Sequence, residues 1–509
     1  MIGAVRAMSY VALCLAPFSW SLAQVDSTAL RYANTITIDD LRRHLSILAS
    51  DEYQGRDTGQ EGQKMAAQYL TQQFSSFGIP PVPASDSAAI VQGYLQPFTL
   101  IEERSGSIRV ATTGDTLGLL SGLLYFNEYL SNDRVVDHVV YLGKGNEWTG
   151  VKGLEGSVAL MRSTGTATEL MSTLRTQAEQ AAKAGVEVLL VSTADMNGLV
   201  KEMGPLVHGS RMRLAYLPTK EKRVGMQVIL VEETQLNTLL TGGNWAKAQR
   251  SKRGKRLGTA FTLLHRPLRQ EVVSENVLAY IEGTDKKDEL VVVTAHYDHV
   301  GVENGEVYNG ADDDGSGTVA LVEMAEAFAK ARVEGNGPRR SVLIMPVSGE
   351  EKGLLGSRYY SDHPVFPMEN TVADLNIDMI GRTDSAHAGG APYIYVIGSD
   401  RLSTDLHRIN EEANSMYTKL ELDYTFNAAN DPNRFYYRSD HYNFARKGVP
   451  SIFYFSGIHE DYHQPGDDVE KIEFDRLHQR ALLVFHTAWE LANQEERIVV
   501  DKPLVPARP

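Results

Sequence analysis

The chain contains 509 residues, of which 42% are hydrophobic and 23% are charged. This composition is typical of a globular protein and excludes low-complexity, collagen-like and polytopic membrane classes. The 65 acidic residues outnumber the 50 basic ones and give a net charge of −15. Nucleic acid is therefore not expected as a partner, because its phosphates attract basic surfaces. At roughly 100–200 residues per domain, the length predicts two or three domains.

The first 23 residues have the pattern of a secretory signal peptide. Arg6 is the only charged residue among them, and an apolar stretch over residues 10–18 is followed by the small-residue ending Ser21-Leu22-Ala23. The apolar stretch is too short to cross a bilayer. We therefore predict an exported protein, periplasmic or extracellular, without stable membrane insertion. Cys14 is the only cysteine of the chain, so the mature protein would have neither disulfides nor thiolate ligands.

Two patterns precede residue 267. Apolar side chains recur at helical spacing over residues 60–77 until Gly78, which predicts an amphipathic surface helix after an earlier helix that opens at residues 38–40. From about residue 94 the sequence changes to short β runs, which predict a β-rich module with its own small core. Its expected elements are strands at 139–142, 158–161 and 188–191 and a helix at 176–184.

From Asn276 onward, apolar strands alternate with helical stretches. Continuous apolar strands between helices imply a sheet that is buried on both faces, so we predict an α/β fold in which a mixed, largely buried sheet is sandwiched by helices. The expected strands are residues 290–293, 342–347, 375–380, 393–397 and 450–455, and the expected helices include 318–331, 402–414 and 474–493.

Polar side chains that can bind metal or move protons follow these strands. In an open α/β sheet, ligands bind at the carboxyl ends of the strands. The residues in such positions are His296 and Asp298, Glu350 and Glu351, Asp378 and His463, and three consecutive aspartates, Asp312, Asp313 and Asp314, precede a helix. Taken singly, each has a simpler interpretation as a helix cap or a solvated surface group.

Their common location argues against the simpler interpretation, because carboxylates gathered at one edge repel one another unless a cation lies between them. Histidine nitrogen and carboxylate oxygen are ligands that suit zinc. Two zinc ions would be neutralised by three carboxylates (Asp313, Glu351 and Asp378) and a bridging hydroxide, which is a known hydrolytic arrangement. Glu350 would then be left as the general base that takes a proton from the water.

Five segments together resemble the metal-site motifs of secreted co-catalytic zinc aminopeptidases, in the exopeptidase family that also contains glutamate carboxypeptidase and the transferrin receptor. The motifs occur in the order of the family. They are Ala295-His296-Tyr297-Asp298, the run from Asn309 to Gly317, the run from Ser348 to Ser357, Asn376-Ile377-Asp378-Met379 and Tyr462-His463-Gln464-Pro465. Residues 48–59 resemble the N-terminal helical region of the family, and residues 156–161 with 181–185 resemble an inserted protease-associated domain.

The resemblance implies a domain organisation and a role for each residue. Residues 24–104 and 267–509 would form the zinc peptidase domain, and residues 105–266 would be the inserted protease-associated domain. His296 and Asp378 would bind one zinc ion, Glu351 and His463 the other, and Asp313 would bridge them. Asp298 would orient the ring of His296, Tyr436 would donate a hydrogen bond to the oxyanion, and the peptide bond after Asp313 would be cis.

The expected activity is hydrolysis of the N-terminal residue of peptides that have a free N-terminus, with Glu350 as the general base. Three alternatives stay open. A carboxypeptidase of the same fold would use a cation such as Arg438 to bind a substrate carboxylate. A glutaminyl cyclase is disfavoured by the intact run of three aspartates, and a binding protein of the transferrin-receptor kind by the presence of every ligand.

Overall fold

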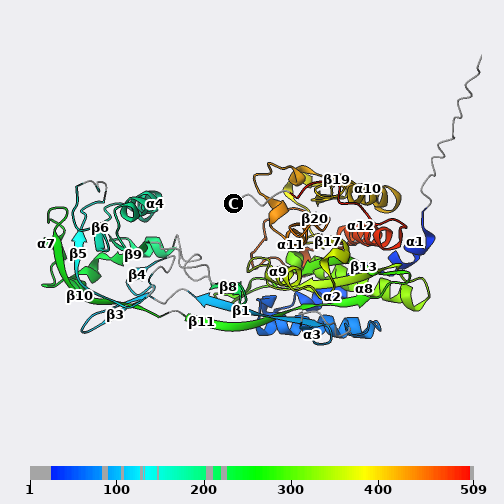
Figure 1. Cartoon of the computed structure of the whole chain (residues 1–509), viewed down its shortest axis with the longest axis horizontal. Coiled ribbons are helices and arrows are strands. Elements are labelled where there is room, and N and C mark those ends of the chain that lie inside the picture. The colour runs from blue at the N-terminus through cyan, green and yellow to red at the C-terminus, as the bar shows by residue number, and fades with distance from the viewer. Residues whose placement is uncertain are drawn as a thin grey trace, which may run out of the picture.

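The computed structural model describes residues 25–82, 90–104, 108–125, 130, 132–145, 148, 150–201, 210–218, 226–266 and 268–504. The predicted signal peptide therefore lies outside the described residues. Figure 1 shows two lobes, each built around its own sheet, with β1 (Leu95–Arg104) and β11 (Leu268–Val277) running between them. No helix among the described residues is long and apolar enough to span a membrane.

The larger lobe contains a seven-stranded mixed sheet. In spatial order its strands are β12 (Ala279–Ile281), β16 (Arg340–Val347), β13 (Lys286–His296), β17 (Thr371–Ile377), β20 (Ser451–Phe455), β18 (Tyr393–Ile397) and β19 (Glu421–Asp423). The four central strands β16, β13, β17 and β20 are parallel to one another. The five predicted strands are confirmed, with differences only at their ends, and the predicted α/β fold with a mixed sheet is correct.

Successive side chains of β13 enter two different cores, as strand geometry requires. Val291 and Val293 belong to the core under the long helices, whereas Leu290 and Val292 belong to the core on the opposite face. Both sets are buried. This explains why the strand is continuously apolar rather than alternating, and it makes the sheet a central layer.

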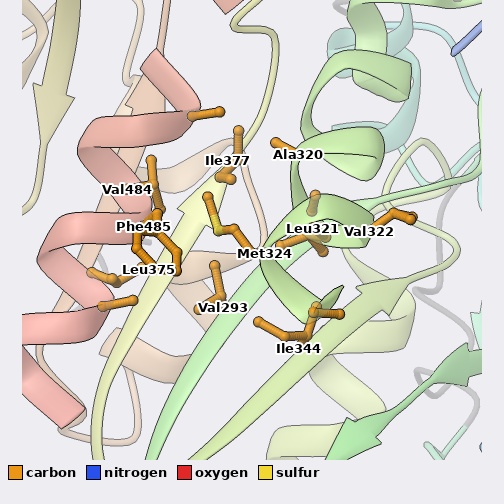
Figure 2. Close-up of a cluster of buried hydrophobic side chains, with 14 of the residues drawn as sticks. Val293, Ala320, Leu321, Val322, Met324, Ile344, Leu375, Ile377, Val484 and Phe485 are labelled. Atoms are coloured by element: carbon orange, nitrogen blue, oxygen red, sulfur yellow. The ribbon is translucent and has the colours of Figure 1, made fainter. Parts of the chain in front are cut away.

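On one face, the sheet is covered by α8 (Gly317–Val333) and α12 (Phe474–Asn493). Figure 2 shows Met324 of α8 and Phe485 of α12 among the side chains that meet strands β13, β16 and β17 in this layer. Almost every side of α8 is buried, which fits its Ala-rich and Val-rich sequence, since a helix that is apolar all round belongs in a core. The opposite face carries α9 (Leu355–Asp362) and α11 (His441–Ala445).

The N-terminal helices complete the larger lobe. They are α1 (Ser27–Ala33), α2 (Ile38–Leu48) and α3 (Glu61–Ser76). A later helix, α10 (Thr404–Ala413), packs against α12. The side chain of Thr37 accepts a hydrogen bond from the backbone N–H of Asp40 and so caps α2. The predicted helices at 38 and 60–77 are confirmed, and Gly78 follows α3 with a positive φ of 75°.

The second lobe is built on an eight-stranded sheet with a core on each face. Its strands in spatial order are β3 (Thr116–Leu117), β2 (Ile108–Ala111), β10 (Arg256–His265), β5 (Arg134–Tyr141), β6 (Val158–Arg162), β7 (Val188–Thr193), β9 (Gln227–Glu232) and β4 (Leu123–Leu124). Its helices include α4 (Ala167–Lys183), α6 (Leu236–Leu239) and α7 (Trp245–Ala248).

The prediction for the helix of this lobe was wrong at its start. α4 begins at Ala167, not at residue 176, because Thr166 and Glu169 form a reciprocal capping box. The helix connects β6 to the parallel strand β7 and therefore forms a β-α-β unit within the sheet.

A three-stranded sheet lies at the junction between the lobes. β1 pairs antiparallel with β11 along ten residues of each strand, and β8 (Ser210–Leu214) adds to the other side of β1. β8 thus comes from within the predicted insertion and pairs with a strand from before it. The proposed domain boundaries at 104/105 and 266/267 stay predictions.

Stability is expected to depend on the neutral form of His486 in α12. Its ring stacks on Tyr417 with 3.8 Å between centroids, and burial lowers its pKa to about 4, against a smaller opposing effect of Asp26. The unfolded chain takes up this proton near pH 6.5, roughly its ordinary pKa. Stability is therefore fully present above that pH and is lost as the pH falls from there toward the folded-state pKa.

Urea unfolding of the wild type and of His486→Phe, at pH 7.5 and 4.5, measures this effect. The free energy of unfolding should fall on acidification by about 2 kcal/mol more in the wild type than in the variant. Equal falls in the two proteins would show that His486 does not cause the acid sensitivity.

Candidate metal centre

The site lies at the carboxyl ends of β13, β16 and β17. β13 ends at His296, and the next residues carry Asp298 and His299 into the site. β17 ends one residue before Asp378. After β16 the chain turns at Gly349, which has a positive φ of 79°, and the turn presents Glu350 and Glu351. Because β13 lies between β16 and β17, these segments are neighbours although they are far apart in the sequence.

The three consecutive aspartates point to different partners. Asp314 accepts hydrogen bonds from the backbone N–H groups of His296, Gly317 and Met379. Asp312 accepts one from the N–H of Gly381 and faces Nε2 of His459 at 3.2 Å. Asp313 faces the metal-site residues.

The peptide bond between Asp313 and Asp314 is cis, as predicted. The backbone N–H groups of Asp312 and Asp313 both donate to the carboxylate of Asp467. The aspartate run is therefore held by backbone hydrogen bonds on either side of Asp313.

The first candidate ligand group consists of His296, Asp313 and Asp378. Nε2 of His296 lies 3.2 Å from Oδ1 of Asp313 and 3.7 Å from Oδ1 of Asp378. All three side chains are nearly or fully buried. The group matches the residues that the sequence predicted for one zinc ion.

The second group shares Asp313 and includes Glu351. Nε2 of His463 lies 3.0 Å from Oδ2 of Asp313 and 3.2 Å from Oε2 of Glu351, so the structure brings the predicted ligands together. His299, which was not predicted, also lies here, with Nδ1 3.0 Å from Oε1 of Glu351. One signal in the sequence points to it, since His299 directly follows Asp298, the last residue of the first motif.

Glu350 lies beside both groups without joining either. Its carboxylate is 4.0 Å from Nε2 of His296 and lines the pocket next to the site. Burial raises the pKa of Glu350 well above its usual range, and the nearby carboxylates of Glu351 and Asp378 add to this while His296 opposes it. A carboxyl group whose pKa is raised in this way suits proton transfer near neutral pH.

Asp298 contacts the ring of His296 through its backbone carbonyl and not through its carboxylate. Nδ1 of His296 pairs at 3.0 Å with the backbone carbonyl of Asp298, whereas the carboxylate is 3.9 Å away. That carboxylate accepts hydrogen bonds from the hydroxyl of Thr58 at 2.6 Å and from the N–H of Glu350 at 3.2 Å. Asp298 therefore joins the N-terminal region, β13 and the Glu350 turn.

Asp378 is oriented by a short hydrogen-bond chain that the sequence did not predict. The hydroxyl of Ser439 donates to Oδ2 of Asp378 at 2.6 Å, and the side-chain amide of Asn376 donates to the same hydroxyl at 2.8 Å. Oδ1 of Asp378 is left facing His296. Ser439 belongs to the Ser-Asp-His sequence beside Tyr436, and its neighbour Asp440 binds the hydroxyl of Ser357.

A small pocket adjoins both ligand groups. Besides five of the metal-site residues, it is lined by Met379, Phe435, Arg438, Phe453, Phe455, Ile458 and Tyr462. Tyr436 is not among the lining residues. Its ring packs under the guanidinium of Arg401, 4.6 Å from the ring centroid, and against Gly398. The assignment of the oxyanion donor to Tyr436 stays a prediction that this packing does not favour.

Arg56 supports the site from behind. Its guanidinium is fully buried and donates to the backbone carbonyls of Leu48, Tyr297, Asn309 and Gly310, at 2.7–2.9 Å. The acceptors come from the end of α2, from the loop after β13 and from the loop before Asp313. One cation therefore joins three segments, and it adds a positive charge behind the buried acids.

Comparison with known proteins agrees with this geometry. Residues 276–488 match peptidase family M28. A probable leucine aminopeptidase of Trichophyton verrucosum is 30% identical over 234 residues, which cover 44% of this chain and 60% of the relative. Aminopeptidase YwaD of Bacillus subtilis is 28% identical over 44% of this chain and 46% of the relative. A probable zinc metalloprotease of Pyrenophora teres is 30% identical over 43% of this chain and 52% of the relative.

Solved structures show the same fold over a longer range. An aminopeptidase from Aneurinibacillus sp. strain AM-1 has a TM-score of 0.53 at 19% identity and covers 94% of this chain and 100% of that chain. A zinc aminopeptidase from Bacillus subtilis has a TM-score of 0.50 at 18% identity and covers 91% of this chain and 98% of that chain. The chain spans about half the length of the curated relatives it matches. The relatives that the chain matches are thus named as aminopeptidases and as a zinc metalloprotease.

Replacing Arg56 with methionine is expected to destabilise the protein by about 3–5 kcal/mol, because it removes the donor that four buried carbonyls share and removes a buried charge. The matched control is Arg43→Met, which removes a half-exposed ion pair with Asp40 and should cost about 0–1 kcal/mol. Urea unfolding of both variants measures the difference. Similar small losses in both would contradict the anchoring role of Arg56.

Proposed function

We propose that this protein is a zinc-dependent aminopeptidase that removes the N-terminal residue from peptides. The observation that carries the proposal is the pair of ligand groups that share Asp313, with the unligated carboxylate of Glu350 beside them. The similarity of residues 276–488 to peptidase family M28 supports it. The proposal covers the activity, the number of zinc ions and the residue roles.

The residues present fit zinc as the bound metal. Their donor atoms are imidazole nitrogens and carboxylate oxygens, which suit zinc. Oδ2 of Asp313 and Oε1 of Glu351 are buried and make no hydrogen bond within the described part of the chain, which is costly unless a cation binds there. We assign His296 and Asp378 to one zinc ion, Glu351 and His463 to the second, and Asp313 to both.

Zinc, when bound, polarises the substrate carbonyl and makes water a stronger acid. The protein contributes the proton acceptor, since Glu350 is placed to take a proton from the attacking water and to return it to the leaving amine. Asp298 holds both the ring of His296 and the backbone of Glu350, which fixes the base relative to a ligand. The apolar part of the pocket, including Phe435, Phe453 and Phe455, suits an apolar first side chain.

A carboxypeptidase is the second candidate, because Arg438 lines the pocket. Its guanidinium lies over the ring of Phe435, 4.8 Å from the centroid, and is placed to pair with a carboxylate of the substrate. Against this, Arg438 is the single arginine or lysine among the residues that line the pocket, and two of the relatives that the chain matches are named as aminopeptidases. The aminopeptidase is therefore the better supported of the two.

The remaining assignments are also proposals. We propose that the second lobe is the protease-associated insertion, on the basis of its separate sheet and cores. Export is proposed on the sequence of residues 1–23. The proposed partners are peptide substrates with a free N-terminus.

The activity can be tested with a mixed peptide set in which each peptide has a free and an acetylated N-terminus. After incubation with the zinc-loaded protein, mass spectrometry should show stepwise loss of single residues from free N-termini only, and a chelated sample should show none. Trimming of both forms from the C-terminus would establish the carboxypeptidase. Loss of ammonia from N-terminal glutamine would indicate a cyclase, and no cleavage of any peptide would contradict the proposal.

The role of Glu350 is tested by Glu350→Gln, which keeps the shape of the side chain but removes the base. Activity on a free-N-terminus peptide should fall by about 10²–10⁴-fold, while zinc content measured by elemental analysis stays at the wild-type level. Glu303→Gln, at an exposed position of β14 (Gly301–Glu303), is the matched control and should keep full activity. Loss of zinc from Glu350→Gln would instead make Glu350 a ligand.

A further inference from the structure

His299 is a buried histidine that none of the roles above uses. It lies three residues after His296, and its side chain is fully buried. The ring packs directly against Gly310, where a Cβ atom would come within 2.5 Å of the ring carbons Cγ and Cδ2. Its backbone N–H donates to the carbonyl of Arg56 at 3.2 Å. The position of the ring is therefore fixed by close packing on the backbone.

The nitrogen Nδ1 of this ring faces the second ligand group. It lies 3.0 Å from Oε1 of Glu351 and 3.8 Å from Oδ2 of Asp313. Within the described part of the chain, neither ring nitrogen of His299 makes a hydrogen bond, and neither do those two carboxylate oxygens. Three buried polar atoms thus converge without satisfying one another, although a buried polar atom is normally hydrogen-bonded.

A cation shared by the three atoms accounts for this arrangement better than a hydrogen bond does. If Nδ1 served only to orient Glu351, its N–H would point at the carboxylate oxygen 3.0 Å away, and the pair would be hydrogen-bonded. Ligand atoms about 2.0–2.2 Å from a tetrahedral zinc ion are roughly 3.3–3.6 Å from one another. The separations of 3.0 and 3.8 Å around Nδ1 bracket that range.

The same comparison holds for the expected ligands. Nε2 of His463 lies 3.0 Å from the carboxylate of Asp313 and 3.2 Å from that of Glu351. Nε2 of His296 lies 3.2 Å from the carboxylate of Asp313 and 3.7 Å from that of Asp378. The ring of His299 is also next to that of His463, with 5.7 Å between centroids and 71° between planes. His299 is therefore placed around the second group as the two expected histidines are placed around theirs.

We propose that His299 is a metal ligand, binding through Nδ1 the same ion as Glu351 and His463. This inference rests on the proposed di-zinc centre and deepens it. The two ions then have unequal surroundings, because the second has two imidazoles and two carboxylates, whereas the first has His296, Asp313 and Asp378. The second ion has four protein ligands and is held more tightly, and the first keeps more positions for water and substrate.

The test counts imidazoles per zinc by X-ray absorption spectroscopy on the full chain, prepared metal-free and loaded with one and then two equivalents of zinc. Without His299, each ion has one histidine, so the mean is one imidazole per zinc at any loading. With His299 as a ligand, two bound zinc ions share three histidines, so the mean is about 1.5 imidazoles per zinc. With one equivalent of zinc the tighter site fills first, and the mean rises toward two imidazoles per zinc. A mean of one at both loadings in the wild type overturns the proposal without any variant.

A variant assigns the extra imidazole to His299. In His299→Gln the mean should return to one at both loadings, and competition with a chromophoric chelator should show the tighter zinc site weakened by at least 10-fold. His486→Gln, which changes a buried histidine in α12, is the matched control and should keep the wild-type count. An unchanged count above one in folded His299→Gln would overturn the proposal.

The coordination test is independent of the activity test. If the peptides are not cleaved but the wild type shows the higher imidazole count, the aminopeptidase proposal fails and the ligand assignment stands. If the peptides are cleaved and the count is one, the ligand assignment fails alone.

Discussion

The burial of acidic side chains at one edge of the seven-stranded sheet is the constraint on which the site depends. Asp298, Asp312, Asp313 and Asp314 are all buried, and an isolated buried charge is too costly to persist. Backbone N–H groups donate hydrogen bonds to the carboxylate of Asp314. The carboxylate of Asp467 accepts hydrogen bonds from the backbone N–H groups of Asp312 and Asp313. These bonds hold the surrounding loops and leave Asp313 facing His296 and His463, which are proposed ligands.

The sheet makes this concentration of charge possible because its two faces are filled with apolar side chains. Val293 and Val292, which are adjacent in β13, belong to different cores, so the strand has no freedom to shift its register. With β16 and β17 paired on either side of β13, the turn that carries Glu350 and the end that carries Asp378 are held at fixed distances from His296. Loops on such a rigid support can place ligands within a few ångströms of one another.

Periodicity was sufficient to predict the strands of the larger lobe and its long helices, because their apolar patterns are continuous and unambiguous. It was insufficient at the start of α4, where the capping pair of Thr166 and Glu169 outweighs a weak apolar pattern. The family resemblance likewise predicted Asp298 as the partner of His296 but not the atom involved, since a contact through a backbone carbonyl leaves no trace in the sequence. His299 was overlooked because its part in the site arises only when the Gly310 loop packs on its ring.

The chain segment that builds the site is longer than the segment that carries its ligands. The similarity to peptidase family M28 begins at residue 276, yet Arg56 and Thr58 lie far before it and bind the loops of Tyr297 and Asp298 directly. Together with the hydrogen bonds of Arg56 to Asn309 and Gly310, these contacts reach the loop that follows His296 and the loop that precedes Asp313. A fragment limited to the matched residues would contain every proposed ligand but would lack the cation that joins their loops. The segment between α2 and α3 is therefore a physical part of the candidate metal centre, although none of the proposed ligands comes from it.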